Sequence, residues 1–195
     1  MVLRSRKRAD SEPGAPGIAG DVDVVAANPG DPDQAAAAVD RCMERFGGLD
    51  ILVNNAATNP YLGPAVDIGL DAYDKTWSVN VRGPLVWTQL AWRAAMQERG
   101  GSVVNISSVG GMTVEPGIGI YNATKAALIH LTKTLAAELA PGVRVNAIAP
   151  GLVKTDMARA LWEPNEERIG GSMPPRRLGG PRDIPAAALY LARDL

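Results

Sequence analysis

Residues 102–151 decide the fold, starting with the run Ser102-Val-Val-Asn-Ile106 and ending with Pro150-Gly151. The first apolar run leads into two serines, and a helical pattern then extends over residues 120–139. A second apolar run covers residues 143–148. A strand, a helix and a strand in this order form a βαβ unit, whose two strands are parallel. The stretch therefore predicts an α/β protein built on a parallel sheet.

The same alternation continues on both sides of this stretch. A helix over residues 31–46 is expected, with Asp31 as N-cap, Pro32 at the first helical position and Gly47 as its stop. A helical region over residues 70–99 contains Pro84, so it is either kinked or divided into two helices. Further strands are expected at 22–26 and 49–53, a last helix at 181–195, and a Pro/Gly-rich loop at 9–20.

Length and composition restrict the class of protein. A chain of 195 residues, 46% hydrophobic and 21% charged, predicts one globular domain spanning residues 1–195. The 20 Lys and Arg balance the 21 Asp and Glu, so no net field favours nucleic acid or an anionic membrane. The sequence contains no run of about 18 apolar residues, so it predicts no membrane-spanning segment. One cysteine (Cys42) and one histidine (His130) argue against a disulfide framework and a metal site.

Tyr121-Asn-Ala-Thr-Lys125 is the candidate for chemistry. Residues four apart share one face of a helix, so the phenol and the ammonium group point the same way. A nearby ammonium charge is expected to lower the phenol pKa from about 10 and let Tyr121 exchange a proton with a substrate oxygen. The alternative is an interface tyrosine beside a solvated lysine.

Other motifs accompany this pair in register. Ser108 precedes Tyr121 by 13 residues at the end of a predicted strand, Asn80 lies in Trp77-Ser-Val-Asn-Val-Arg-Gly83, and Asn54 and Pro150 follow two other strands. Together these segments, from about residue 2 to 194, resemble the short-chain dehydrogenase/reductase family. The resemblance implies a Rossmann-like, doubly wound parallel sheet and reversible hydride transfer between a nicotinamide cofactor and a carbonyl or alcohol.

The resemblance also implies roles for single residues. Tyr121 is similar to the catalytic acid/base, Lys125 to the residue that lowers its pKa and holds the cofactor ribose, and Ser108, rather than the adjacent Ser107, to the hydroxyl that orients the substrate. Asn80 is similar to the residue that holds a relay water. The cofactor-binding positions that the family pattern implies are Arg6, Lys7, Asn28, Asn54, Ala56, Tyr121, Lys125, Pro150, Gly151, Val153 and Thr155.

The basic residues near the N-terminus favour NADP(H) over NAD(H). Arg6 and Lys7 lie where the family's second strand ends, and a basic side chain there suits the 2′-phosphate. A disordered basic tail is the alternative. Asn28 stands where the family usually has aspartate, which weakens the expected contact with the adenine.

The family's glycine-rich fingerprint after the first strand is absent. Gly14-Ala-Pro-Gly17-Ile-Ala-Gly20 mimics it, but no strand leads into it and it follows the basic strand end. We therefore expect a sheet that lacks the first strand with its glycine loop and the last strand. The loss of a central strand should expose backbone groups and apolar surface, and should weaken the binding of NADPH.

Two functions are open at this point. The first is an NADP(H)-dependent oxidoreductase acting on a small-molecule carbonyl or alcohol. The second is a catalytically silent member of the family that acts as a subunit or binding module. We further expect a cytoplasmic homo-oligomer, a tetramer, assembled through the helices at 70–99 and 120–139.

Overall fold

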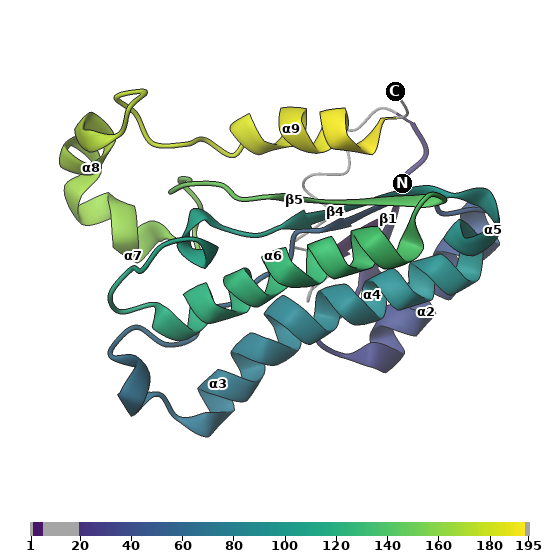
Figure 1. Cartoon of the computed structure of the whole chain (residues 1–195), viewed down its shortest axis with the longest axis horizontal. Coiled ribbons are helices and arrows are strands. Elements are labelled where there is room, and N and C mark those ends of the chain that lie inside the picture. The colour runs from purple at the N-terminus through teal and green to yellow at the C-terminus, as the bar shows by residue number, and fades with distance from the viewer. Residues whose placement is uncertain (1, 6–19, 194–195) are drawn as a thin grey trace.

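The computed structural model describes residues 2–5 and 20–193, and every structural statement below refers to these residues. The strands are parallel and form two sheets (Figure 1). In the first, β1 (Val2–Ser5) pairs with β2 (Asp23–Ala26). In the second, β4 (Gly101–Ile106) lies between β3 (Ile51–Asn54) and β5 (Val143–Ile148). The parallel α/β class is therefore confirmed, and the carboxyl ends of β3, β4 and β5 meet at one rim.

Helix α2 (Pro32–Phe46) has the bounds that the sequence predicts because both of its ends are chemically marked. The Asp31 side chain accepts hydrogen bonds from two N–H groups of the first turn, which have no partner within the helix. At the other end, Gly47 adopts the left-handed region with φ 68° and donates its N–H to Met43 O.

The region from 70 to 99 is helical throughout. It consists of α3 (Leu70–Trp77), the π turn η3 (Ser78–Arg82), α4 (Gly83–Ala91), the π turn η4 (Trp92–Met96) and α5 (Gln97–Arg99). Pro84 lies in the first turn of α4, directly after the wider π turn, where its ring is tolerated. A division into two separate helices, one of the two expected outcomes, is therefore wrong.

The loop that precedes α2 docks on this helical region. Arg82 Nη2 donates to Gly30 O at 2.9 Å, and Trp87 Nε1 donates to Pro29 O at 3.2 Å. Gly83 leaves room for this contact, because a Cβ there would lie 2.7 Å from Pro29 O. These contacts join the half of the molecule that contains β1 and β2 to the half that contains β3, β4 and β5.

Helices cover the larger sheet on both faces. Helices α4 and α6 (Gly119–Leu139) lie on one face and α9 (Asp183–Ala192) lies on the other (Figure 1). Adjacent residues of a strand face opposite sides, and Val103 and Val104 of β4 are both 0% exposed, so both faces of this strand are covered. Much of the core comes from Ala35, Ala38, Val39, Leu52, Trp87, Ala91, Met96, Val103, Leu135, Val143 and Val145.

Between β5 and α9 the chain forms short helices that the sequence did not predict: α7 (Arg159–Trp162), η6 (Glu163–Asn165) and α8 (Glu166–Ser172). Two other short turns, η2 (Ala65–Asp67) and η5 (Val109–Gly111), precede α3 and α6. Helix α9 is shorter than the expected 181–195. Its last turn is fastened to the sheet, since Arg144 Nη1 and Ser102 Oγ both donate to Leu191 O.

Strand β3 is covered on one face only. Leu52 is 9% exposed, whereas its neighbours Ile51 and Val53 are 50% and 42% exposed. Along its edges β3 pairs with β4 and with no other strand of the described ranges. Strand β3 is therefore an edge strand of the three-stranded sheet with one exposed face.

The two faces of β3 should respond differently to truncation. We expect Leu52→Ala to lower the free energy of unfolding by about 2–4 kcal/mol, because it leaves a cavity beneath α4. Val53→Ala should lower it by less than about 1 kcal/mol, since this side chain faces solvent. Urea unfolding followed by circular dichroism measures both values, and equal losses would contradict this orientation of β3.

Candidate active site

Two adjacent serines leave the end of β4 in different directions. Ser107 is buried, and its Oγ donates to Lys125 O of α6 at 2.9 Å. Ser108 is half-buried, accepts a hydrogen bond from Gly110 N at 3.2 Å and lies close enough to the Tyr121 hydroxyl to lower its pKa. The structure therefore places Ser108, and not Ser107, beside the tyrosine.

Tyr121 lies in the first turn of α6 and is largely enclosed. Burial raises the pKa of its hydroxyl, the neighbouring Ser108 side chain lowers this pKa, and the negative charge of Glu115 raises it further. The net effect is a raised pKa, which corrects the expected lowering by Lys125. The physical reason is that a partly enclosed phenolate loses more hydration than the nearby hydroxyl returns.

Lys125 is one turn further along α6 and is 2% exposed. Its Nζ donates to Ile106 O at 2.8 Å and lies 5.6 Å from the centre of the Tyr121 ring. Desolvation lowers the pKa of this ammonium group from 10.5 to about 8. Even so, most Lys125 side chains keep their charge at neutral pH.

Asn80 lies in the π turn η3, and both polar atoms of its side chain bind protein groups. Its Oδ1 accepts from Thr58 N at 2.8 Å, and its Nδ2 donates to Thr58 O and to Thr124 Oγ1, both at 3.0 Å. Thr124 in turn donates to Tyr121 O at 2.7 Å, which ties the π turn to the start of α6. The main-chain carbonyl of Asn80 lacks its usual helical donor, because Pro84 has no N–H.

A chain of buried amides lies beneath these residues. Asn54 Nδ2, at the end of β3, donates to Asn105 Oδ1 at 2.9 Å, and Asn105 Nδ2 donates to Thr132 Oγ1 of α6 at 2.9 Å. Asn54 and Asn105 are 2% and 0% exposed, so they join β3, β4 and α6 from within. Sequence reasoning left Asn105 without a role, and no local pattern would have revealed Thr132 as its partner.

Those residues expected to bind a cofactor that the structure describes in this half lie along the rim at the carboxyl ends of β3, β4 and β5. Ala56 is half-buried after β3, and Gly151 is exposed after β5 with no heavy atom within 4 Å of its Cβ position. Pro150 O accepts from Val109 N at 2.9 Å, and Val153 forms a bridge with Gly179. Thr155 is exposed, and its carbonyl accepts a hydrogen bond from Trp162 Nε1 at 3.2 Å.

The remaining residues expected to bind the cofactor belong to the half that contains β1 and β2. Asn28 Oδ1 already accepts from Gly30 N at 3.2 Å, so this amide braces its own loop. Arg6 and Lys7 lie outside the described residues, as do Gly14 and Gly17.

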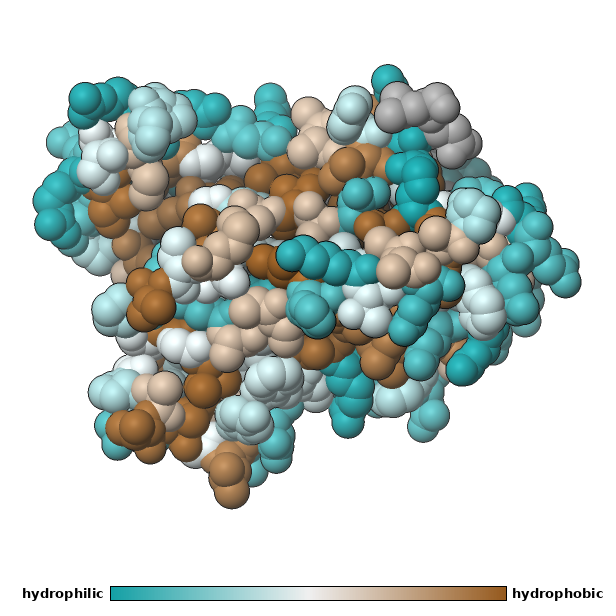
Figure 2. Space-filling view, in the orientation of Figure 1, coloured by the Kyte–Doolittle hydropathy of each residue, from teal (hydrophilic) through white to brown (hydrophobic). Residues whose placement is uncertain are grey.

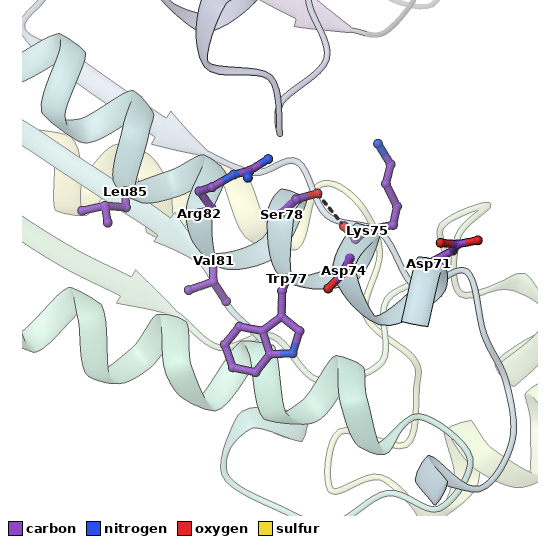
Figure 3. A pocket seen from close by; sticks show the side chains of 8 residues that line it. All are labelled: Asp71, Asp74, Lys75, Trp77, Ser78, Val81, Arg82 and Leu85. Atoms are coloured by element: carbon purple, nitrogen blue, oxygen red, sulfur yellow. Dashed lines mark hydrogen bonds between the residues drawn. The ribbon is translucent and has the colours of Figure 1, made fainter. Parts of the chain in front are cut away.

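A hollow of about 740 Å³ is a different feature (Figure 3). It runs along the outside of α3, η3 and α4, and none of Asn80, Ser108, Tyr121 and Lys125 lines it. Its lining residues are Asp71, Asp74, Lys75, Trp77, Ser78, Val81, Arg82 and Leu85.

Further features of the described part of the chain bear on metal and membrane binding. It contains no group of three or more His, Cys, Asp or Glu that could hold a metal ion. Its helices include none that is long and apolar enough to cross a bilayer. His130 is exposed on α6, and Cys42 is half-buried beside Gly48 O.

Comparison with known proteins identifies the family. A family model described as Enoyl-(Acyl carrier protein) reductase matches residues 3–195. Dehydrogenase/reductase SDR family member 4 of Rattus norvegicus is 36% identical over 200 residues, covering 100% of this chain and 72% of its own length. The chain belongs to the short-chain dehydrogenase/reductase family.

Other members of the family are similar over different shares of their length. The Homo sapiens family member 4 is 42% identical over 78% of this chain, and the chain spans only 56% of that protein. A gluconate 5-dehydrogenase from Burkholderia cenocepacia, solved with NADP and tartrate, has a TM-score of 0.87 at 29% identity, covering 98% of this chain and 77% of its own. The Rossmann-like fold of the family is thereby confirmed.

The buried Lys125 should give the stability a specific pH dependence. Its pKa is lower in the folded chain, so above about pH 8 the folded form loses a proton that the unfolded form keeps to about 10.5. Stability due to this residue therefore rises with pH. Between about pH 7.5 and 9.5 we expect the wild-type chain to gain about 2 kcal/mol relative to Lys125→Met. Urea unfolding at both pH values measures the difference, and parallel curves would refute a buried ammonium group.

Proposed function

We propose that the chain is an oxidoreductase that transfers a hydride between NADP(H) and a carbonyl/alcohol pair, with Tyr121 as the acid/base. The observation that carries the proposal is the placement of Ser108 beside Tyr121 in a site that also holds the buried Lys125. These groups come from β4 and α6, and they meet at the rim where parallel α/β sheets bind ligands.

The protein residues manage the proton and the orientation of the substrate. With its pKa raised, the Tyr121 hydroxyl keeps its proton at neutral pH and donates it to the carbonyl oxygen during reduction. The Ser108 hydroxyl holds the same oxygen. The bound cofactor supplies the hydride. Lys125, mostly charged at neutral pH, stabilises the phenolate that forms.

A relay water would return the proton from bulk solvent to this pair. Both polar atoms of the Asn80 side chain already bind protein groups, namely Thr58 and Thr124. We therefore assign the water to the Asn80 carbonyl, which Pro84 leaves without its usual donor. In this scheme Asn80 positions the water, and Thr124 keeps the π turn in register with α6.

The residues present fit a nicotinamide nucleotide at the rim of β3, β4 and β5. Gly151 has open space where a side chain would stand, and the Thr155 segment borders it. Tyr121, Lys125 and the turn at Asn54 and Ala56 would lie beside the ribose. The choice of NADP(H) rests on the sequence positions of Arg6 and Lys7, and weak binding stays a prediction because no glycine loop is recognised.

Assembly and location are part of the proposal. Ala123, Ala126, His130, Lys133 and Ala137 form an exposed stripe along α6 at helical spacing. Small side chains allow two such helices to pack closely, which supports a homo-oligomer, a tetramer, through α6 and the 70–99 region. A single domain over 1–195 and a cytoplasmic location stay predictions of the sequence.

Removing the Tyr121 hydroxyl should separate catalysis from binding. We expect Tyr121→Phe to lower kcat for NADPH-dependent reduction by at least about 100-fold while the Kd for NADPH changes little. Absorbance at about 340 nm follows NADPH, and quenching of tryptophan fluorescence gives the Kd.

Tyr190→Phe is the matched control, because Tyr190 is 60% exposed on α9. Loss of activity in this control, or a Tyr121→Phe enzyme with more than about a tenth of the wild-type kcat, would contradict the assignment. A wild-type chain that binds NADPH and reduces no carbonyl would favour a silent binding module.

The helical stripe should control assembly. We expect Ala126→Arg to convert the oligomer to monomers at micromolar concentration, because it places a charge in the contact between α6 helices. Ala37→Arg, at an exposed position of α2, should leave the sedimentation coefficient unchanged. A wild-type chain that sediments as a monomer would refute the proposed tetramer.

A further inference from the structure

The segment from η5 to the start of α6 carries a carboxylate beside the reacting groups. Glu115 is half-buried in this segment, six residues before Tyr121. Its backbone carbonyl accepts hydrogen bonds from Ile118 N and from Asn122 Nδ2, both at 3.5 Å. These contacts fold Glu115 back against the first turn of α6, the turn that presents Tyr121.

Gly110 provides the space for this side chain. A methyl group at Gly110 would overlap both Glu115 Oε2 and Asn122 Oδ1, so both oxygens face the glycine. Gly110 also donates its N–H to Ser108 Oγ. The Glu115 carboxylate therefore lies against the same turn that orients Ser108, between this turn and α6.

The charge of Glu115 is not balanced locally. Glu115 forms no ion pair within residues 20–193. The nearby Asn122 Oδ1 is buried without a donor among these residues, and an amide oxygen cannot donate a hydrogen bond to the carboxylate. Around Tyr121 the charged groups are Lys125, from α6, and Glu115, from the preceding segment. Lys125 Nζ donates to Ile106 O, and it forms no ion pair with Glu115.

Basic side chains are absent from the two loops that border the site on this side. Residues 57–67 and 109–120 contain no Lys, Arg or His, and the two loops are joined by the hydrogen bond from Gly63 N to Gly117 O at 2.9 Å. Apolar side chains stand exposed there instead, at 62% for Leu62, 63% for Met112 and 93% for Val114. Apolar surface also gathers at the left end of the molecule, where these loops lie (Figure 2).

Beyond β5, three of the cations are paired with carboxylates. Lys154 pairs with Glu166, Arg159 with Asp156, and Arg177 with Asp183. A substrate carboxylate on this side of the site would thus meet Glu115, and Lys125 is the cation beside Tyr121.

We propose that Glu115 is a specificity-determining residue that excludes substrates with a negative charge next to the reacting carbonyl, so that the site takes uncharged carbonyl compounds. This inference rests on the proposed function and deepens it. Like charges within about 10 Å at a partly buried site repel strongly enough to change a specificity constant severalfold. The same charge disfavours the Tyr121 phenolate and keeps the acid protonated.

A matched pair of substrates tests the proposal. Benzoylformate and its methyl ester share one skeleton and differ in a single negative charge. We expect the wild-type chain, saturated with NADPH at pH 7, to reduce the ester with a higher kcat/KM. In Glu115→Gln the ester-to-acid ratio should fall by about fivefold to tenfold, mostly through faster reduction of the acid. Glu115→Asp, which keeps the charge, should retain most of the wild-type ratio.

Glu138→Gln is the control, since Glu138 is exposed at the far end of α6, about 25 Å from Tyr121 at 1.5 Å per residue. It should leave the ratio unchanged. A wild-type ratio near one, or an unchanged ratio in Glu115→Gln, would overturn the role of Glu115 while turnover itself upholds the proposed function. No turnover of either substrate would instead refute the proposed function.

A second readout does not depend on turnover. The chain has four tyrosines, so ¹³Cζ-tyrosine NMR with Tyr121→Phe as the assignment standard follows the Tyr121 hydroxyl alone. Glu115→Gln should lower the pKa of Tyr121 because it removes a nearby negative charge, whereas Glu138→Gln should not. An unchanged Tyr121 pKa in a folded Glu115→Gln chain would show that the carboxylate does not act on the site.

Discussion

The site depends on the contact between a buried lysine of α6 and the end of β4. Lys125 Nζ donates to Ile106 O, and Ser107 Oγ donates to Lys125 O, so α6 and β4 each supply one donor and one acceptor. An ammonium group inside a protein is costly unless it is hydrogen-bonded, so this contact tolerates little displacement. It fixes the rotation of α6 and thereby brings Tyr121 to Ser108.

The elements that were predictable from the sequence are those with chemical marks at their ends. Asp31 and Gly47 define α2 because a side-chain cap and a left-handed residue act locally. Residues 152–181 have no comparable marks, and their short helices are held by contacts such as Trp162 to Thr155. Pro84 is a third case, because a proline predicts a disturbed helix but does not reveal that a π turn will absorb it.

The candidate site likewise contains residues that the sequence predicts and contacts that it does not. Ser108, Tyr121 and Lys125 follow from spacing, since a strand end and one helix face bring them together. The pairing of Asn105 with Thr132 depends on how two elements pack, and the influence of Glu115 depends on the space at Gly110. The direction of the Tyr121 pKa shift was missed for the same reason, because burial cannot be read from the spacing of two residues.

The π turn η3 has contacts on both of its sides. On one side, Asn80 donates hydrogen bonds to Thr58 and Thr124 in the half that contains Tyr121. On the other side, Arg82 donates to Gly30 O in the loop that follows β2. The five residues of η3 therefore connect the two halves of the molecule. A rotation of the β1–β2 half at η3 would displace Asn80 and Thr124, so it would also change the geometry around Tyr121.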